Sequence, residues 1–283
     1  MPVTDADLAQ LAGSPDIISL GMLADDARRR LHGGRTTFVR VGHLPADPLA
    51  PMVRAASAGE MRLDGTPSSR AVALEQVVRA RVAAGDAPLS AFSLSDLEQL
   101  AAREAVTLRA LLEELRAAGL ELIAEAPIDL LQSARRSIEE VNIAGLALAR
   151  LTVHQAPAAD PIPLLKSVAD LQRTVAVIRA FAPLPRAINS AVPTTGYDDV
   201  KRIALARLIV DNIPSIQVDW SLYGPKLAQV ALTVGADDID EVSAADDVSR
   251  GRRRAPLEEV RRNIIAAGQE PVERNGRFDL ISS

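Results

Sequence analysis

The chain has 283 residues, of which 48% are hydrophobic and only 2% aromatic, so a large core has to be built mainly from Leu, Val, Ile and Ala. A net charge of −5 excludes the basic surface expected of a protein that binds nucleic acid or an anionic membrane. The sequence contains no cysteine, which excludes disulfides, Cys-bound zinc and any iron–sulfur cluster held by its own thiolates.

The first residues, "MPVTDADLAQLAGSPD", carry acids where a signal peptide needs a basic region and then an apolar one. No run of about 18 apolar residues, the length that crosses a bilayer, occurs in the sequence. We therefore expect a cytoplasmic protein without a membrane span.

Short apolar runs alternate with helical patterns along the chain, which is typical of β/α units with a parallel sheet. The expected strands are 36–42, 60–65, 88–92, 121–125, 146–154, 175–183, 215–223 and 237–241. Among the helices between them, Leu108, Leu111, Leu112 and Leu115 fall on one face, and Gly119 follows as a stop signal. Ser93 and Asp96 have the spacing of a capping box, and Pro225 fits the first turn of a helix.

Eight such alternations without a break in composition predict a single (β/α)8 barrel of the TIM type. An open doubly wound sheet is the alternative, and it is less favoured because its outer strands would be exposed edges. We expect one domain over 1–283, with an N-terminal helical extension over 1–34, the barrel over 35–241 and a C-terminal extension over 242–283. The short segment after the first strand leaves open whether the barrel is incomplete or distorted there.

In a barrel, functional side chains gather at the C-terminal ends of the strands. The ligand-binding candidates at these positions are His43, Asp64, Glu125, His154, Asp219 and Trp220. For the histidines the competing role is a loop hydrogen bond, and for the acids Asp64 and Glu125 it is an ion pair with Arg62 or Arg186. For Trp220 the competing role is packing in the apolar core. Only one of Asp219 and Trp220 can face the interior of the barrel, because they are neighbours on a strand. No nucleophile, P-loop, dinucleotide or metal motif occurs, so catalytic residues stay unknown and no metal site is expected.

Three stretches resemble radical S-adenosylmethionine enzymes of the futalosine route to menaquinone, with aminofutalosine synthase as the nearest type. They are "LGMLADDARRRLHGGRTTFVRVGHLP" (20–45), "LSAFSLSDLEQLAAREAVTLRALLEELRAAGLELI" (89–123) and "PTTGYDDVKRIALARLIVDNIPSIQVDWSLYGPKLAQVALTVGADDIDE" (193–241). The words DNIP, GPKLAQ and GADDID are the most specific, and the stretches occur in the order that the family uses. The resemblance implies a barrel that carries a [4Fe–4S] cluster on CxxxCxxC in the loop after the first strand.

The cofactor-binding words of that family are missing here. The loop reads "GHLPADPLAPMVRAASAGE" (42–60), with Ala50 about where the first cysteine would fall. The glycine segments that the family places after its second and fourth strands read "RLDGTP" and "IAEAPID", of which only Gly65 remains, and its Tyr-Gly-His after the fifth strand reads "VHQAP". We therefore expect no iron–sulfur cluster and no S-adenosylmethionine binding.

Three hypotheses follow from this contrast. The leading one is a cluster-less, non-radical homologue of aminofutalosine synthase, acting as a non-catalytic protein partner of menaquinone-pathway enzymes or as a protein that binds a chorismate- or futalosine-related ligand. The second is a non-radical enzyme acting on such a substrate at the barrel mouth. The third is a structural subunit that pairs with a catalytic relative.

Overall fold

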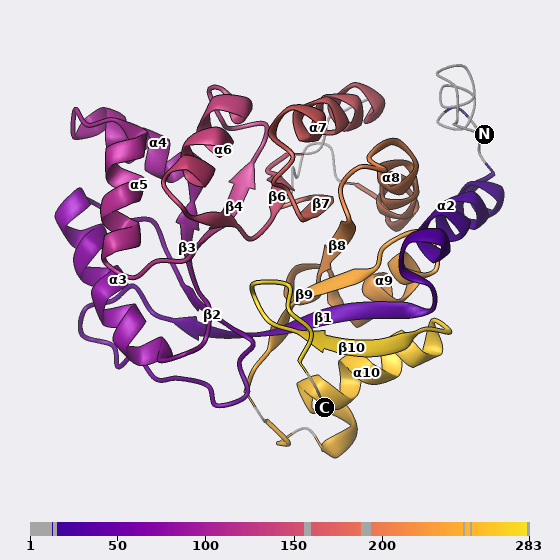
Figure 1. Cartoon of the computed structure of the whole chain (residues 1–283). Coiled ribbons are helices and arrows are strands. Elements are labelled where there is room, and N and C mark those ends of the chain that lie inside the picture. Colours follow the sequence, from indigo (N-terminus) through magenta and orange to yellow (C-terminus); the bar gives the residue numbers. More distant parts are fainter. Residues whose placement is uncertain are drawn as a thin grey trace.

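The computed structural model describes residue 13 and residues 16–155, 160–187, 194–245, 247–249 and 251–281. Its centre is a parallel barrel surrounded by helices (Figure 1). The strands are β1 (Arg35–Leu44), β2 (Glu60–Leu63), β3 (Leu89–Ser93), β4 (Leu122–Pro127), β5 (Ala147–Leu148), β6 (Leu151–Val153), β7 (Ala180–Pro185), β8 (Ser215–Asp219), β9 (Asp238–Ser243) and β10 (Glu270–Arg274).

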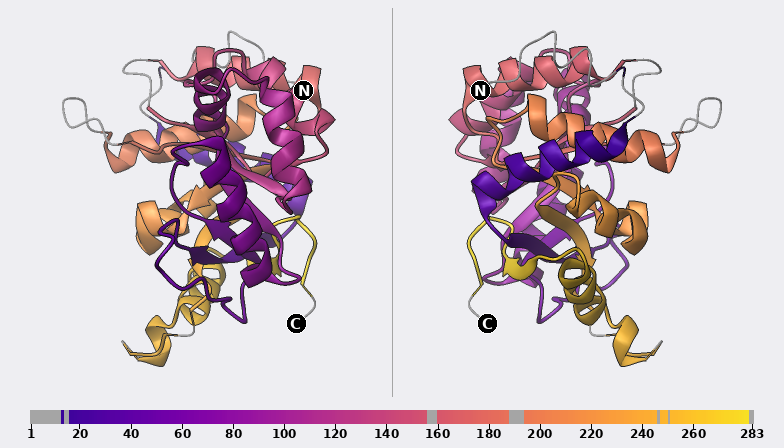
Figure 2. Two further views of the ribbon diagram at one scale, coloured as in Figure 1. Left: turned by 90° about the vertical axis from the view of Figure 1, so that its left-hand side faces the viewer. Right: turned by 90° about the vertical axis from the view of Figure 1, so that its right-hand side faces the viewer.

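The helices lie outside this barrel, as the two side views in Figure 2 show. They are α2 (Ile17–His32), α3 (Arg70–Ala84), α4 (Leu94–Arg103), α5 (Leu108–Ala117), α6 (Ala134–Ile143), α7 (Ile162–Val175), α8 (Gly196–Ile209), α9 (Trp220–Leu232), α10 (Pro256–Ala266) and the short 3₁₀ helix η1 (Arg252–Arg254). Among the described residues, no helix is long and apolar enough to span a membrane.

Barrel closure takes place at β1, which pairs in parallel with β2 on one side and β9 on the other. The predicted (β/α)8 barrel is confirmed, and the open-sheet alternative is wrong because no edge remains between β1 and β9. The concern that the barrel is incomplete near its first strand is also resolved, since the short loop after β1 still allows Val41 to Leu44 to pair with β2.

Three predicted strands differ markedly in their limits: 146–154, 215–223 and 175–183, the last of which becomes β7 and begins only at Ala180. The run 146–154 is split into β5 and β6 by Ala149 and Arg150, which extend neither strand. The run 215–223 ends as a strand at Asp219, because the Asp219 side chain accepts a hydrogen bond from the backbone N–H of Leu222 at 2.8 Å and so caps α9. Gly224, with φ of 75°, kinks α9, and the helix resumes at Pro225 as expected.

The expected capping box at Ser93 is wrong. Ser93 precedes α4, but its side chain makes no capping hydrogen bond and lies 2.9 Å from the Ser95 hydroxyl instead. The Asp96 carboxylate accepts a hydrogen bond from Thr66 at 2.6 Å. A carboxylate that could have closed the cap is thus turned toward the loop after β2.

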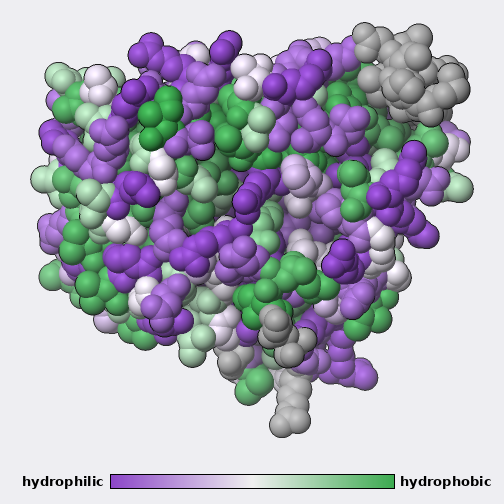
Figure 3. Space-filling view, in the orientation of Figure 1, coloured by the Kyte–Doolittle hydropathy of each residue, from purple (hydrophilic) through white to green (hydrophobic). Residues whose placement is uncertain are grey.

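Strand β10 was not expected. It pairs with Arg35 to Val39, the first half of β1, whereas β2 pairs with the second half. Arg274 at its end is buried and donates two hydrogen bonds of 2.6 Å to Asp238 in β9. On the face shown in Figure 3, apolar side chains gather beside the C-terminal end of the described chain, where Leu280 and Ile281 are exposed.

Side chains alternate along the strands and place polar groups inside the barrel. In β9, Asp238 and Asp240 bond to polar side chains of other strands, while Ile239 between them belongs to the apolar core. In β2, Glu60 and Arg62 bond to each other, while Met61 and Leu63 belong to the core. Because successive strand residues point to opposite faces, the barrel interior is filled by ion pairs and the layer beneath the helices is apolar.

Candidate functional site

A cavity of about 510 Å³ opens at the C-terminal ends of the barrel strands. Apolar surface comes from Leu63, Phe92, Ala124 and Leu222. The charged groups come from every side of the mouth, and they are His43, Arg62, Asp64, Asp96, Glu125, Arg150, Arg186, Asp219 and Glu241. The cavity is therefore a polar, solvent-open site at the place where barrels of this type carry function.

His43, at the end of β1, lies between two carboxylates. Its Nδ1 is 2.7 Å from Oδ1 of Asp64, and its Nε2 is 2.9 Å from Oε2 of Glu241. Hydrogen bonds to Asp64 and then to Glu241 raise the pKa of His43 to about 10. The ring is thus a cation at neutral pH, donating a hydrogen bond to each acid.

This pKa predicts a loss of stability at alkaline pH. Because the pKa is raised above 6.5, the stabilisation by protonated His43 is fully present below pH 6.5 and is lost as the pH rises through about 10. The His43 side chain is 46% exposed, so solvent screening limits the effect. We expect His43→Gln to cost about 1 kcal/mol at pH 6 and almost nothing at pH 10.5, measured by urea unfolding. A cost that is the same at both pH values would contradict this assignment.

Arg62, in β2, is the centre of a buried ion network below His43. Its guanidinium donates to Glu60 at 2.6 and 2.9 Å, lies 3.3 Å from both oxygens of Asp240, and donates to Glu241. Asp240, Glu60 and Glu241 together outweigh burial and hold the pKa of Arg62 above its usual value. Burial opposes ionisation of the acids, but Arg150 and Arg62 keep the pKa of Asp240 well below its usual range, and Arg62 and His43 lower that of Glu241 to about 2.

Arg186, just after β7, ties two of the predicted acids together. Its Nε is 3.1 Å from Oε2 of Glu125, and its Nη1 donates to Oδ2 of Asp219. The prediction that a rim arginine pairs with Glu125 agrees with this contact. Asp64 bonds to His43 and not to an arginine, because Arg62 is already held by Glu60, Asp240 and Glu241.

Arg150 occupies the break between β5 and β6 and is 5% exposed. Its Nη1 donates to Asp240, and its Nη2 is 3.7 Å from Oε1 of Glu241, which is beyond hydrogen-bond distance. Its Nε is buried and has no hydrogen-bond partner among the described residues. Burial, followed by the neighbouring cation Arg62, lowers the pKa of Arg150.

Glu241 enters the site through an unusual backbone conformation. It has φ of 62°, a left-handed value that is uncommon outside glycine, and the neighbouring pairing of β1 with β9 shifts register between Phe38 and Arg40. Strict alternation would turn Glu241 away from the barrel, yet both Asp240 and Glu241 contact Arg62. Sequence reasoning missed Glu241 for this reason, although the acidic run "DDIDE" was a signal.

The predicted site residues divide into two groups. His43, Asp64, Glu125 and Asp219 line the cavity, whereas His154 and Trp220 are not among its lining residues. Trp220 begins α9 and is 8% exposed within the apolar core, and the backbone N–H of His154 donates to Asp129 at 2.7 Å. A ligand-binding role for any of the six residues stays a prediction.

A model of the CofH/MqnC C-terminal region matches residues 183–282, which hold β8, β9 and β10 with their helices. Over residues 183–282 the chain is similar to the C-terminal region of the CofH/MqnC proteins. The resemblance to the radical S-adenosylmethionine enzymes of the futalosine route is thereby confirmed.

Related proteins support the same relationship over shorter and longer segments. Aminodeoxyfutalosine synthase of Thermus thermophilus is 35% identical over 108 residues, covering 35% of this chain and 29% of that protein. Cyclic dehypoxanthine futalosine synthase of Streptomyces coelicolor is 25% identical over 212 residues, covering 66% of this chain and 53% of that protein. The chain thus matches 29% of the length of the first relative and 53% of the length of the second.

Solved structures show the same fold at low identity. Methylornithine synthase (PylB) superimposes with a TM-score of 0.66 at 13% identity, covering 96% of this chain and 94% of that one. The [FeFe]-hydrogenase maturase HydG superimposes with a TM-score of 0.65 at 10% identity, covering 95% and 73%. At such identities the likeness concerns the barrel alone.

The CofH/MqnC relationship raises the question of an iron–sulfur cluster, and the residues present do not fit one. The loop between β1 and β2 has no thiolate, and the carbonyl of Ala50, about where a first cysteine would fall, accepts a hydrogen bond from Arg79 at 3.4 Å. His43 is held between Asp64 and Glu241. Carboxylates and a single imidazole do not replace three soft thiolates, so no radical step is assigned to this chain.

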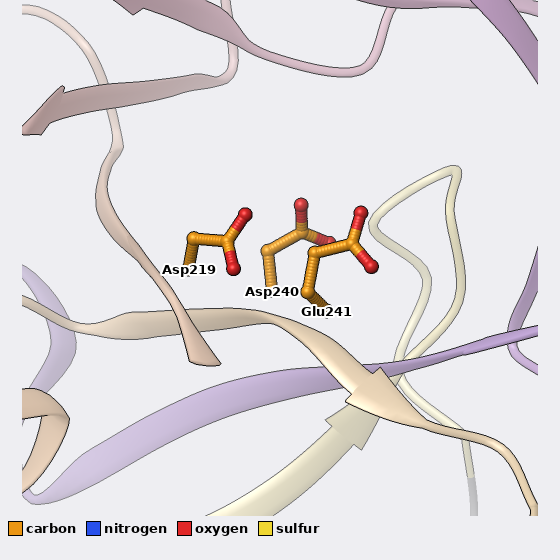
Figure 4. Close-up of side chains that lie close together, drawn as sticks. All are labelled: Asp219, Asp240 and Glu241. Carbon is orange, nitrogen blue, oxygen red and sulfur yellow. The ribbon is translucent and has the colours of Figure 1, made fainter. Parts of the chain in front are cut away.

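Asp219, Asp240 and Glu241 bring three carboxylates close together (Figure 4). One oxygen of each lies within 4.8 Å of the others, a spacing that could hold a cation. Each carboxylate is already paired with an arginine, Asp219 with Arg186 and the other two with Arg62. Because a cation would compete with these guanidinium groups, we assign no metal site.

Proposed function

We propose that this chain is a cluster-free, non-radical relative of the futalosine-pathway synthases that binds a small polar molecule at the barrel mouth. The observation that carries the proposal is the open cavity of about 510 Å³, lined by charged side chains, in a barrel whose chain has no cysteine. Cavities of roughly 300–1,000 Å³ with a few convergent polar groups are typical small-molecule sites.

The charges of the mouth favour binding over acid–base catalysis. A general base works best with a pKa near the operating pH, whereas His43, with its pKa of about 10, has no free lone pair at neutral pH. Glu125 and Asp219 are both engaged by Arg186. These groups keep their charges at neutral pH and can orient a ligand. Because none of them is poised to exchange a proton, the hypothesis of a non-radical enzyme has less support.

The relatives suggest the class of ligand. Aminodeoxyfutalosine synthase and cyclic dehypoxanthine futalosine synthase are named for futalosine-type molecules, and the present cavity lies in a barrel related to theirs. We therefore propose a futalosine-type or chorismate-derived ligand and a role beside menaquinone biosynthesis. Pairing with a catalytic, cysteine-containing relative stays a prediction that co-purification would test.

Thermal unfolding with added ligands tests the proposal. Aminodeoxyfutalosine, futalosine and a chorismate-derived enol ether are the probes, and S-adenosylmethionine is the comparison. A true ligand at 100 times its dissociation constant stabilises the folded state by about 2.7 kcal/mol. Arg135→Ala, at an exposed ion pair on α6, is the control that keeps the response, and Arg186→Gln is expected to lose it. The proposal fails if none of the three probes shifts the transition of the unchanged protein.

A further inference from the structure

Two neighbouring parts of the barrel mouth carry charges of opposite sign. In the order of the strands, Asp64 after β2, Asp96 in α4 and Glu125 in β4 form one acidic segment. Arg150 between β5 and β6 and Arg186 after β7 form the adjoining basic segment. These two segments, the acidic wall and the basic wall, meet at the Glu125–Arg186 ion pair of 3.1 Å. The remaining charged lining residues are His43 and Arg62 beside Asp64, and Asp219 and Glu241 beyond Arg186.

The basic wall has donors that the described residues do not satisfy. A guanidinium has five N–H donors, and Arg186 uses its Nε and Nη1 for Glu125 and Asp219, leaving its Nη2 without a hydrogen bond among described residues. Within the described ranges, Arg150 donates a hydrogen bond only through Nη1, to Asp240. Its buried Nε has no acceptor in the described part of the chain. The buried Nε of Arg150 is closed to the cavity, so the Nη2 groups of Arg150 and Arg186 are the donors that an acceptor in the cavity would meet.

The acidic wall has unused acceptors. Asp64 accepts from His43 through Oδ1, Asp96 accepts from Thr66 through Oδ2, and Glu125 accepts from Arg186 through Oε2. In each carboxylate the second oxygen makes no hydrogen bond among the described residues. Carboxylates also outnumber cations around the cavity, so a ligand carrying only negative charge would add to an existing excess.

From this arrangement we propose that the cavity takes a dipolar ligand, with an anionic group against Arg150 and Arg186 and a cationic or hydrogen-bond-donating group toward Asp64, Asp96 and Glu125. The two charges of the ligand are separated by an apolar body, which lies against Leu63, Phe92 and Leu222. The inference rests on the proposed function and adds the chemical class of the molecule. Such pairing uses charge-assisted hydrogen bonds at both ends, which are the strong ones.

Three small probes test the inference on the full chain by isothermal titration. They are 6-aminohexanoate, which carries both charges, hexanoate, which carries only the negative charge, and hexylammonium, which carries only the positive charge. We expect 6-aminohexanoate to bind about tenfold or more tightly than either of the others, because each lost charge-assisted hydrogen bond costs roughly that factor. Arg150→Lys keeps the positive charge beside Asp240 but removes the guanidinium fork, and it is expected to weaken 6-aminohexanoate about tenfold.

Glu125→Gln provides a second variant that leaves Arg150 in place, in case Arg150→Lys does not fold. It is expected to weaken 6-aminohexanoate and to leave hexanoate unchanged or tighter, while Arg135→Ala changes neither. Equal affinity for hexanoate and 6-aminohexanoate overturns the dipolar site. If futalosine-type ligands bind and 6-aminohexanoate neither binds nor competes, the dipolar site is wrong and the proposed function stands. If neither set binds, both are wrong.

Discussion

Replacing Arg62 with Met is expected to lower the free energy of unfolding by about 3–5 kcal/mol, the usual cost of removing one partner from a buried ion pair. Arg62 is 4% exposed and forms ion pairs with Glu60, Asp240 and Glu241. Met fills a similar volume but donates no hydrogen bond. Asp240 then keeps Arg150 and Glu241 keeps His43, while Glu60 loses its ion pair with Arg62. Urea unfolding at pH 7, with the change in midpoint and in slope recorded, measures the cost.

The matched control is Arg135→Ala, which breaks an ion pair one helical turn apart on α6 whose side chains are 67% and 39% exposed. Such pairs contribute about 0.3–0.5 kcal/mol. If Arg62→Met and Arg135→Ala cost the same, the interior network does not hold the barrel together and the described packing is wrong.

The second large effect is expected at Arg207, which is fully buried between α8 and the barrel. Its guanidinium donates to the carbonyls of Gly235 and Pro214, at 2.8 and 3.2 Å, and to the carboxylate of Asp237. Arg207→Met leaves two carbonyls and a buried carboxylate without this donor, and we expect a loss of about 3–5 kcal/mol in urea unfolding.

Arg173→Ala is the control for this variant, since Arg173 pairs with Asp170 on α7 at side-chain exposures of 69% and 65%. It is expected to change stability by less than about 0.5 kcal/mol. Because Arg207 lies outside the cavity lining, Arg207→Met protein that still folds is also expected to bind ligands at the mouth with unchanged affinity. A large loss of stability in Arg173→Ala, or none in Arg207→Met, would contradict the account of this layer.

The most specific word of the sequence, "GADDID", has a structural explanation. Gly235, with φ of 116°, lies so close to Arg207 that a Cβ there would come within 2.8 Å of the Arg207 Cβ. Asp237 holds Arg207 outside the barrel, Asp238 holds Arg274, and Asp240 holds Arg62 and Arg150 inside it. The motif therefore specifies the ion pairs that hold β9 in the barrel. For this reason it indicates which proteins the chain is related to and does not indicate a reaction.

The fold could be predicted from the sequence because the periodicities of strand and helix alternate regularly, and strands such as β2, β7 and β8 are buried on both faces. Strand β10 escaped because "EPVER" combines a proline with charges, and its pairing depends on the distant contact between Arg274 and Asp238. The start of β7 was placed too early because Val175 ends α7 and Ala176, with φ of 53°, terminates that helix.

The cavity lining could be predicted only where a residue lies at or near the C-terminal end of a strand. His43, Asp64, Glu125 and Asp219 were found in this way, and all four line the cavity. Arg150 lies in a break within one expected strand, and Glu241 itself has a left-handed backbone conformation. Neither side chain therefore follows the alternation of strand residues between two faces from which the other positions were predicted. Trp220 begins α9 and does not extend the strand, because Asp219 caps that helix, and it is not among the residues that line the cavity.

Anaerobic reconstitution with ferrous iron and sulfide tests whether this barrel can hold a cluster and cleave S-adenosylmethionine. The reconstituted chain is reduced with dithionite in the presence of S-adenosylmethionine, and 5′-deoxyadenosine is measured, with aminodeoxyfutalosine synthase of Thermus thermophilus treated in parallel as the positive control. Because the loop after β1 offers no thiolate, the account predicts no 5′-deoxyadenosine above that of the heat-denatured chain. Formation of 5′-deoxyadenosine in proportion to the amount of folded protein would contradict it.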